Sequence, residues 1–418
     1  METIRRMESK VRSYSRSFPV VFKRAKDAFL FDSKGTRYID FFAGAGTLNY
    51  GHNNEMMKEK IIDYLNNDGI IHGLDMATVA KTDLLNKLES IVFKPRNLDY
   101  KVQFTGPTGT NAVEAALKLA RMIKKRSNVI SFTNGYHGLT MGSMSVTANA
   151  FYRDQAFIDR SDVSFLPYDR YLGKEVNTAT YMRRFLEDNS SGVEIPSAMI
   201  LETVQGEGGI HVASDEWLRE VEAICREFDI LLIIDDIQVG NGRTGYFFSF
   251  EKAGIKPDIV TLSKSFGGYG LPLSVVLFKR DLDIWKPGQH TGTFRGNNLA
   301  FVAAAAALDY WTDDSFSKEI FRKGKIIETR LKMLKEKYPE LKAQVRGRGF
   351  IFGLAVSPAQ QASKIAQECF KNKLILELAG ATNNVIKFLA PLTISDDILS
   401  EGLNILEKSI SNVLKGSK

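Results

Sequence analysis

Two charged side chains stand at the ends of buried strands in this sequence, a carboxylate at Asp235 and an amine at Lys264. The apolar run 230–234 ends abruptly at Asp235, and the strand candidate 259–262 is followed by Lys264. If the two strands are neighbours in a parallel sheet, both side chains reach the same edge, where such sheets bind their ligands. The sequence therefore predicts a site that combines a carboxylate with an amine.

The glycines that follow Lys264, at Gly267, Gly268 and Gly270, would let a ligand approach the backbone closely. Either charge taken alone is better explained as strand-end solvation or a surface ion pair. A buried lysine with a lowered pKa, however, forms Schiff bases, and an aspartate facing a pyridine nitrogen is the pairing expected for pyridoxal phosphate. We therefore expect this cofactor, with Lys264 as its reactive amine and Asp235 as its partner.

A helix expected over residues 111–126 opens with Gly109 and Thr110. A helix N-terminus with free N–H groups and a small hydroxyl can bind a phosphate. A plain capping turn at 108–110 explains the same residues, and the sequence alone slightly favours it. Histidines are far apart and no His or Cys pair has metal-ligand spacing, so no metal site is expected.

The composition is that of an ordinary globular protein. Of 418 residues, 44% are hydrophobic and 25% are charged, which argues against a disordered chain, a collagen or a coiled coil. The longest apolar runs, such as 301–308, are too short to span a membrane, and the polar segment 1–16 lacks the form of a signal peptide. Cys225 and Cys369 cannot form a disulfide framework. We expect a cytoplasmic protein without membrane association.

The net charge of +7 and the pI of about 9.1 raise the question of nucleic-acid binding. A basic balance indicates such a partner only when the charge is clustered. Lys and Arg are scattered here, and the short clusters at 121–126 and 322–337 lie on helices with ordinary apolar periodicity. We expect no nucleic-acid partner and small-molecule substrates instead.

Short β-branched runs alternate with helical periodicity between residues 55 and 278, which is typical of a mostly parallel sheet covered by helices on both faces. A helix is expected over 214–228, capped by Ser214, and a long one over 298–338. We predict an α/β protein with an N-terminal segment (1–54) that belongs to the small lobe, a large domain (55–305) and a smaller α+β domain (306–418). The strand candidates are 29–32, 36–42, 101–104, 128–132, 163–166, 198–204, 230–235, 259–262 and 274–278.

Six motifs in this order resemble those of the class III pyridoxal-phosphate aminotransferases, and the resemblance extends over nearly the whole chain, from residue 19 to residue 393. One such motif alone would be weak, but the ordered set is highly specific. The resemblance implies fold type I of the pyridoxal-phosphate transferases. The motifs are 105–111 (TGPTGTN), 136–138 (YHG), 202–208 (ETVQGEG), 235–238 (DDIQ), 242–245 (GRTG) and 263–265 (SKS).

The resemblance implies a role for each residue that matches a motif. Lys264 would form the Schiff base with the cofactor and then move the proton between the substrate and the cofactor. Asp235 would bind the pyridinium nitrogen and keep it protonated. Tyr136 and Ile237 would lie against the two faces of the ring, and Gln238 would bond its phenolic oxygen.

The family also implies how the phosphate is held. Gly109 and Thr110 would bind it at the helix N-terminus, which reverses the preference for a plain capping turn. Thr293 is similar to a residue that reaches the phosphate from the partner subunit, which implies a homodimer or a dimer of dimers. His137 would support Tyr136 through hydrogen bonds.

Within the family, the segments 73–78 (GLDMAT), 106–116 (GPTGTNAVEAA) and 292–299 (GTFRGNNL) resemble the diaminobutyrate–2-oxoglutarate transaminases of ectoine biosynthesis. Such enzymes move an amino group from L-glutamate to L-aspartate 4-semialdehyde and give L-2,4-diaminobutyrate and 2-oxoglutarate. Alternatives from the same fold are an ω-aminotransferase for ornithine, GABA or β-alanine, a semialdehyde aminomutase, or a diaminobutyrate transaminase of another pathway. A binding or regulatory protein without activity is a further alternative, but the presence of Lys264 and Asp235 argues against it.

The substrate carboxylate is where the sequence departs from many relatives. Lys387 stands where they have a carboxylate-binding arginine, and a lysine cannot form the bidentate fork. Glu207 matches the acid that pairs with this arginine, so Glu207 and Lys387 form either a switch or a permanent ion pair. Arg295 is an extra cation that would supply the missing guanidinium or serve the dimer interface. Arg16 lies in a segment that covers the active site in relatives, which makes it a candidate substrate contact.

Overall fold

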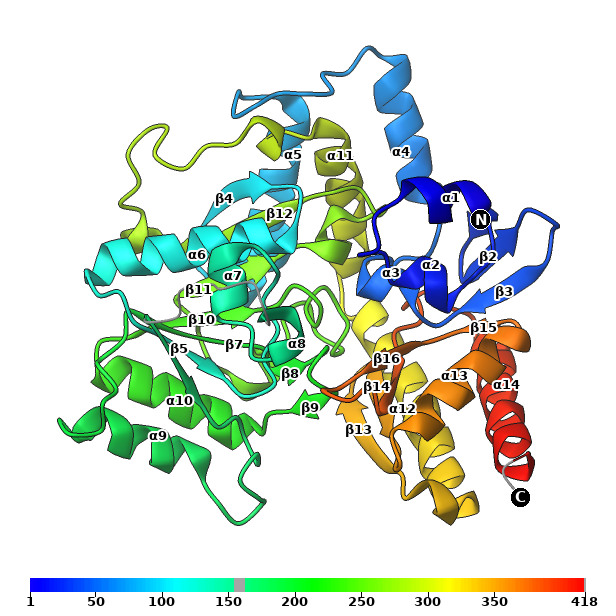
Figure 1. Cartoon of the computed structure of the whole chain (residues 1–418). Coiled ribbons are helices and arrows are strands. Elements are labelled where there is room, and N and C mark those ends of the chain that lie inside the picture. The colour runs from blue at the N-terminus through cyan, green and yellow to red at the C-terminus, as the bar shows by residue number, and fades with distance from the viewer. Residues whose placement is uncertain (154–161, 417–418) are drawn as a thin grey trace.

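A seven-stranded sheet forms the centre of the computed structural model, which describes residues 1–153 and 162–416 (Figure 1). The strand order is β4-β12-β11-β10-β7-β5-β6. All neighbouring strands are parallel except at β12, which is antiparallel to both of its neighbours. The expected α/β fold with a mostly parallel sheet is therefore confirmed. The strands are β4 (Tyr100–Gly106), β12 (Ser274–Lys279), β11 (Ile259–Leu262), β10 (Leu231–Asp235), β7 (Ala198–Leu201), β5 (Val129–Phe132) and β6 (Val163–Leu166).

Both faces of this sheet are buried by helices, which explains why its strands are continuously apolar. On β10, Ile233 packs in one core together with helix α6 (Gly109–Lys124). The next residue, Ile234, packs in a second core with helix α10 (Asp215–Glu227). In Figure 1, α6 lies above the strands and α10 below them. The alternation follows from the two-residue period of a strand.

Helix α10 begins where its sequence pattern indicates. The Ser214 side chain accepts a hydrogen bond from the backbone N–H of Trp217 at 3.3 Å, which caps the helix. Trp217 and Val221 are buried on its apolar stripe. The expected boundaries, 214–228, therefore agree with the observed helix to within one residue at each end.

The single strand expected over 198–204 is wrong. Strand β7 ends at Leu201, and the chain resumes as β8 (Val204–Gln205), which pairs with β9 (His211–Val212) in a separate hairpin. Glu202 lies at the break between these two strands. Its carboxylate accepts hydrogen bonds from the backbone N–H groups of Tyr136 and Gly206, both at 3.0 Å. This acid therefore directs the chain out of the large sheet.

A second, antiparallel sheet lies in the C-terminal part of the chain, in the order β13-β14-β17-β16. Three helices accompany it in the yellow, orange and red part of Figure 1. These elements are α12 (Ser315–Lys337), β13 (Gln344–Arg348), β14 (Ile351–Ala355), α13 (Gln360–Lys371), β16 (Glu377–Ala379), β17 (Val385–Phe388) and α14 (Asp396–Lys415).

The prediction of one long helix over 298–338 is also wrong, because the helical segment is interrupted. Helix α11 (Asn298–Ala307) continues into a short 3-10 turn, and α12 begins at Ser315. At the interruption the Asp313 carboxylate accepts a hydrogen bond from the backbone N–H of Ser315 at 2.8 Å. Local side-chain hydrogen bonds of this kind compete with helical ones.

The N-terminal segment is joined to the C-terminal part by strand pairing. Strands β1 (Phe22–Lys26), β2 (Phe29–Asp32) and β3 (Arg37–Asp40) form a meander, and β3 pairs in parallel with β15 (Leu374–Ile375). The sequence indicated β2 and β3 but missed β1, which has no buried residue and no regular alternation of exposure. The pairing agrees with a lobe built from both chain ends, while the domain limits at 54 and 305 remain a prediction.

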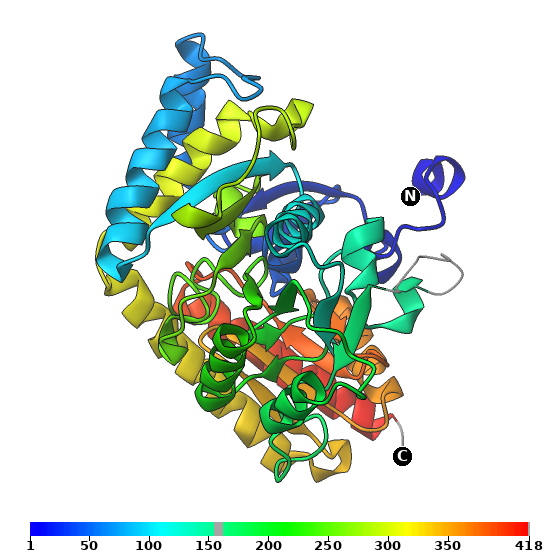
Figure 2. The ribbon, with the colours of Figure 1, turned by 90° about the vertical axis from the view of Figure 1, so that its left-hand side faces the viewer.

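Further helices complete the fold around the large sheet. Helix α1 (Glu2–Met7) has no buried residue and stands at the margin of the molecule in Figure 2. The others are α2 (Tyr14–Ser17), α3 (Ala43–Gly46), α4 (Glu55–Asn66), α5 (Val79–Lys87), α7 (Met141–Ser145), α8 (Ala150–Arg153) and α9 (Thr178–Glu187).

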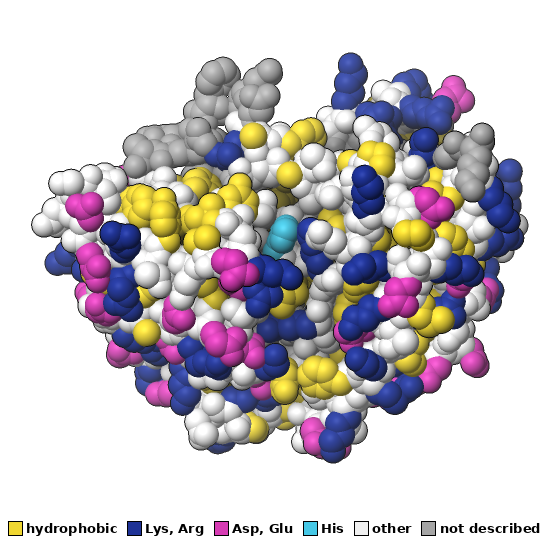
Figure 3. Space-filling view, turned by 90° about the horizontal axis from the view of Figure 1, so that it is seen from below, with side chains coloured by type: hydrophobic (Ala, Val, Ile, Leu, Met, Phe, Trp, Pro, Cys, Tyr) yellow, Lys and Arg dark blue, Asp and Glu magenta, His cyan; other side chains and the backbone are white. Residues whose placement is uncertain are grey.

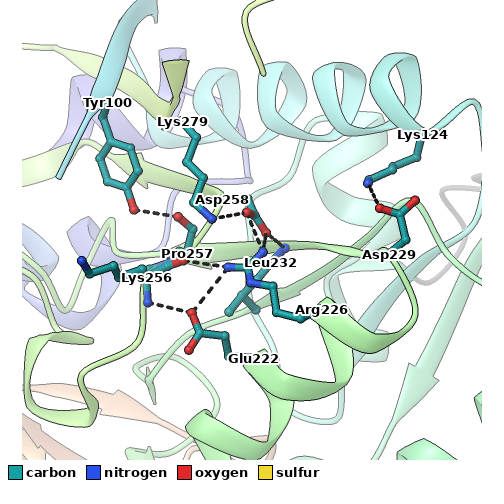
Figure 4. A network of polar contacts seen from close by, with 10 residues as sticks. All are labelled: Tyr100, Lys124, Glu222, Arg226, Asp229, Leu232, Lys256, Pro257, Asp258 and Lys279. Atoms are coloured by element: carbon teal, nitrogen blue, oxygen red, sulfur yellow. Dashed lines mark hydrogen bonds and ion pairs between the residues drawn. The ribbon is translucent and has the colours of Figure 1, made fainter. Parts of the chain in front are cut away.

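A buried carboxylate, Asp258, fixes the starts of β10 and β11 (Figure 4). It accepts two hydrogen bonds from Arg226 at 2.7 and 2.8 Å, one from Lys279 at 2.7 Å and one from the backbone N–H of Leu232 at 2.9 Å. A fully partnered carboxylate of this kind is costly to disturb. It therefore secures the register of the two strands that carry the polar residues at their other ends.

Charged side chains of both signs cover the surface. On the face in Figure 3, Lys and Arg are interspersed with Asp and Glu. Cys225 and Cys369 are buried and unpaired. In the described parts of the chain, no helix combines the length and the apolar character needed to cross a membrane.

Candidate active site

The pairing of β10 with β11 brings Asp235 and Lys264 to one edge of the large sheet. Asp235 is the register partner of Thr261, and the Thr261 hydroxyl donates a hydrogen bond to Asp235 Oδ1 at 3.1 Å. Lys264 comes shortly after Thr261 in the sequence, just past the end of β11. The prediction that two neighbouring strands present a carboxylate and an amine at the same edge is therefore confirmed.

Lys264 begins a 3-10 turn and has a left-handed backbone conformation, with φ of 50°. No hydrogen bond or ion pair joins its amine to any other residue in the described ranges. Burial lowers the pKa of Lys264 below its ordinary value, and the nearby carboxylate of Glu207 opposes this shift. A lowered pKa gives a larger fraction of the neutral, nucleophilic amine.

Two of the glycines after Lys264 make room for other parts of the chain, whereas the sequence predicted room for a ligand. A Cβ atom at Gly268 would lie 2.5 Å from the carbonyl oxygen of Ala303 on α11, and one at Gly270 would lie 2.9 Å from the side chain of Leu48. Both glycines also have positive φ angles. They therefore allow the lysine loop to pack closely against the protein itself.

Asp235 is held in place by three groups and is almost fully buried. His137 Nδ1 donates to Asp235 Oδ2 at 2.7 Å, and the backbone N–H of Ile237 donates to Oδ1 at 3.2 Å, beside the bond from Thr261. His137 is buried as well, and its Nε2 atom has no hydrogen-bond partner within the described residues. His137 therefore supports Asp235, in addition to its expected place behind Tyr136.

The N-terminus of α6 lies beside this carboxylate. The Asn111 side chain accepts hydrogen bonds from the backbone N–H and the hydroxyl of Thr108, while no acceptor among the described residues bonds the N–H groups of Gly109 and Thr110. A Cβ atom at Gly109 would lie 2.9 Å from Ile237 Cδ1. Two donors and the partial positive charge of the helix end are thus available to an anion next to Ile237.

The Tyr136 loop packs against the same helix end. A Cβ atom at Gly138 would lie 2.6 Å from the hydroxyl of Thr110, so the close approach requires glycine there. The Tyr136 backbone N–H is fixed by Glu202, whose pKa burial raises to about 7. The Tyr136 ring contacts the Tyr152 ring at a centroid distance of 5.3 Å.

Gln238 connects these residues with a second group of charges. Its Nε2 atom donates to Glu207 Oε1 at 3.0 Å and to the Ala45 carbonyl at 3.1 Å. Its Oε1 atom is buried and has no hydrogen-bond partner in the described parts. A Cβ atom at Gly206 would collide with this oxygen, so Gly206 makes room for the amide.

Lys387 is fully buried between two carboxylates. Its Nζ atom lies 2.5 Å from Glu207 Oε1 and 2.8 Å from Glu377 Oε2. Glu377 faces Lys387 directly across the β16–β17 pair. Although burial opposes both shifts, Lys387 lowers the pKa of Glu207 to about 2, and the two carboxylates raise the pKa of Lys387. Glu207 and Lys387 are therefore both charged at neutral pH.

Glu377 is a site residue that the sequence analysis missed. It lies in the apolar run 374–378, where a lone charged residue within a strand was an available signal. The Tyr14 hydroxyl donates to Glu377 Oε1 at 2.8 Å, and burial together with this acid raises the pKa of Tyr14. The N-terminal segment is thus tied to the charge cluster by Tyr14.

A cavity of about 830 Å³ opens beside the cluster. Glu207 and Glu377 line it together with Tyr14 and Arg16. The Arg16 guanidinium donates to the carbonyls of Arg12 and Lys10, so the structure places it at the cavity wall but engaged with its own segment. A second cavity, of about 490 Å³, is lined by Tyr136 and shares Glu207 with the first.

Thr293 and Arg295 lie in another part of the chain. The Thr293 carbonyl is 2.7 Å from His72 Nε2, and Arg295 pairs with Asp75 at 2.5 Å and donates to the His290 carbonyl at 2.8 Å. No contact among the described residues joins either side chain to Lys387 or Lys264. Within one chain, Arg295 therefore does not replace the missing arginine.

The described residues contain no group of three or more His, Cys, Asp or Glu side chains placed to hold a metal ion.

Arg243, in the 242–245 motif, is fully buried and donates to the carbonyls of Ala390 and Phe350 at 2.7 and 3.3 Å. These bonds make it an anchor between the loops of the two sheets.

This geometry agrees with what the family comparison finds. Residues 11–410 match the model of the aminotransferase class-III family, so the chain belongs to this family of enzymes.

Its curated relatives include several that carry one and the same name. The diaminobutyrate–2-oxoglutarate transaminase of Wolinella succinogenes is 60% identical over 99% of this chain and 97% of the relative. Proteins of that name from Halalkalibacterium halodurans and Halomonas elongata are 56% and 55% identical, over 99% and 98% of this chain and 97% and 98% of theirs.

Solved structures share the fold. An ornithine aminotransferase from Toxoplasma gondii matches with a TM-score of 0.86 at 25% identity, covering 99% of this chain and 95% of that one. A Bacillus anthracis aminotransferase matches with a TM-score of 0.88 at 23% identity, covering 98% of this chain and 97% of the other, which supports the fold alone.

Proposed function

We propose that this chain is a cytoplasmic diaminobutyrate–2-oxoglutarate transaminase that uses pyridoxal phosphate and acts in the first dedicated step of ectoine biosynthesis. It transfers an amino group from L-glutamate to L-aspartate 4-semialdehyde. The observation that carries the proposal is the half-buried Lys264 beside Asp235, in a class III aminotransferase whose relatives of 54–60% identity bear this name.

The residues at the sheet edge fit pyridoxal phosphate. The phosphate would bind the N–H groups of Gly109 and Thr110, and the pyridinium nitrogen would face Asp235, which His137 holds. Ile237 lies next to Gly109, and there its side chain would contact one face of the cofactor ring. Tyr136 would cover the other face. Gln238 Oε1 and the backbone N–H groups of Gly109 and Thr110 have no hydrogen-bond partner among the described residues, and the cofactor would provide polar partners for them.

When bound, pyridoxal phosphate supplies an electrophilic carbon for the amine and a ring that delocalises electrons from the substrate Cα. Asp235, held by His137, would favour the protonated ring nitrogen and thereby strengthen this delocalisation. Lys264, without a competing partner in the described residues, is free to take the proton from the substrate Cα and return it. Burial excludes water from Asp235.

Lys387 is proposed to hold the α-carboxylate of glutamate after Glu207 has moved away. We expect Lys387→Ala to raise the Michaelis constant for glutamate strongly, since loss of one partner of a buried charge pair costs about 2–5 kcal/mol. The constant for diaminobutyrate should rise less. Steady-state kinetics with both substrates measure this. Equal losses for both would make Lys387 a structural ion pair, and an unchanged glutamate constant would exclude it from carboxylate binding.

A homodimer with shared sites is proposed from the surroundings of Thr293. The segment 70–79, which contacts Thr293 and Arg295, exposes a group of apolar side chains of the kind that a second copy of the chain would cover. Thr293 of one subunit would then contribute to the phosphate site of the other. The exposed apolar residues are Ile70, Ile71, Leu74, Met76, Val79 and Phe294.

Hybrid dimers test the shared site. Lys264→Ala subunits mixed with Thr293→Ala subunits should form one site free of both changes, because Lys264 and Thr293 of that site come from different chains. The activity of verified hybrids should approach half that of the unaltered dimer and exceed that of either parent. If verified hybrids recover no activity, each site is built from one chain.

A substrate panel tests the proposed reaction. Purified enzyme with pyridoxal phosphate and 2-oxoglutarate is assayed for glutamate formation from diaminobutyrate, ornithine, 4-aminobutyrate and β-alanine. The highest kcat/KM is expected for diaminobutyrate. A preference for ornithine, 4-aminobutyrate or β-alanine would assign the chain to another ω-aminotransferase.

A further inference from the structure

The charge cluster beside the 830 Å³ cavity has one cation for two carboxylates. Lys387 is 0% exposed and Glu377 is 7% exposed, while Glu207 is half-buried. The sum of the three charges is negative, and a buried charge without compensation is unfavourable unless a ligand balances it. An ion pair built for stability alone would need one acid, not two.

The second acid also has a free hydrogen-bonding position. Glu377 Oε1 accepts the Tyr14 hydroxyl at 2.8 Å, whereas Glu377 Oε2 is buried and accepts no hydrogen bond from the described residues. Lys387 Nζ forms an ion pair with Oε2 at 2.8 Å, and a carboxylate oxygen can accept more than one contact. Oε2 therefore keeps the capacity to accept one from a ligand in the cavity that Glu377 lines.

The chemistry of this position suits an ammonium group. While both acids face the cavity they would repel a ligand that presents only a carboxylate, and a neutral group would leave the negative charge uncompensated. The aromatic rings of Tyr14, Phe18 and Tyr152 line the same cavity and suit a cation beside the acids.

We propose that Glu377, fixed by Tyr14, is a specificity-determining residue that binds the non-reacting α-ammonium group of diaminobutyrate. This inference rests on the proposed function and deepens it. The terminal amine of the substrate points towards Lys264, and its α-ammonium group meets Glu377 and Glu207. The same acids give no advantage to an ω-amine that lacks the α-ammonium group.

A comparison of diaminobutyrate with 4-aminobutyrate tests the proposal, because the two differ by the α-amino group. In the holoenzyme, Glu377→Gln should lower kcat/KM for diaminobutyrate by at least about tenfold, since hydrogen bonds to charged groups are worth this much. The loss should be mainly in KM. The values for 4-aminobutyrate should stay within about threefold. The constant for glutamate should not rise, because the change leaves Lys387, the cation proposed to bind its carboxylate, in place.

The control is Glu328→Gln on α12, an acid that pairs with Lys325 and Lys332 outside the cavity lining, which should leave the ratio of the two substrates unchanged. Equal losses for diaminobutyrate, 4-aminobutyrate and glutamate would overturn the proposal, since they would indicate a misplaced Lys387. An unchanged ratio would overturn it too. A wild-type enzyme that does not use diaminobutyrate would instead refute the proposed function.

If Glu377→Gln does not fold, Tyr14→Phe tests the same point. The variant removes the hydrogen bond that fixes Glu377 and keeps the ring. The ratio of kcat/KM for diaminobutyrate to that for 4-aminobutyrate should fall in the same direction by a smaller factor. An unchanged ratio would contradict the role of Glu377.

Discussion

Lys264→Ala is expected to abolish transamination and to remove the visible absorbance of the Schiff base between the lysine and the cofactor, while the chain still folds. The amine lies just past the end of β11, half-buried and without a hydrogen-bond or ion-pair partner in the described residues, so its removal breaks no ion pair. It is the group proposed to form the covalent link and to move the proton. Single-turnover assays with glutamate, an absorbance spectrum and circular dichroism measure the three effects.

Lys252→Ala provides the matched control for the lysine change. Lys252 pairs with Asp215 at the surface, and its side chain is mostly exposed, so both spectrum and activity should remain those of the unaltered protein. Measurable turnover in Lys264→Ala, above a trace of contaminating wild type, would remove Lys264 from the proposed chemistry.

Asp235→Asn should reduce the rate of proton abstraction at the substrate Cα by about 10²-fold or more. The amide preserves the shape, but it carries no charge and no longer keeps the pyridinium nitrogen protonated. The hydrogen bond from His137 Nδ1, at 2.7 Å, also loses its charged acceptor. Cofactor binding should remain measurable. Stopped-flow absorbance with glutamate labelled with deuterium at Cα reports the step itself through its isotope effect.

The neighbouring acid offers a matched control. Asp236 lies next in sequence, is fully buried, and accepts a hydrogen bond from the Ser249 backbone N–H at 3.0 Å. Burial raises the pKa of Asp236 to about 7, so a neutral form is already populated near neutral pH and an amide should be tolerated. Asp236→Asn is therefore expected to stay within a few-fold of wild type. Equal effects of the two changes would argue against a special role for Asp235.

The strands of the large sheet could be predicted because burial on both faces requires an uninterrupted apolar run. The ends at Asp235 and near Lys264 followed from the same rule, since a charge at the end of such a run marks the sheet edge. The breaks at Glu202 and Asp313 could not be predicted, because each depends on which backbone N–H groups a carboxylate meets. Apolar periodicity carries no record of such bonds.

Site residues could be predicted where they lie in continuous sequence motifs, but not where strand pairing brings distant residues together. The residues around Asp235 and Lys264 lie in continuous motifs, whereas the cluster of Glu377 with Lys387 forms when two strands pair and the N-terminal Tyr14 closes over them. A single charged residue in a short apolar run indicates burial of a charge, but it does not identify the partner.

Nitrogen transfer from one defined position of the substrate is the most direct measurement. Diaminobutyrate labelled with nitrogen-15 at the 4-amino group, and a second sample labelled at the 2-amino group, are each incubated with the holoenzyme and 2-oxoglutarate. The glutamate formed is then analysed by mass spectrometry. We expect label in glutamate from the 4-labelled sample and none from the 2-labelled sample, with aspartate 4-semialdehyde as the co-product. Label from the 2-amino group, or no labelled glutamate from either sample, would contradict the proposed reaction.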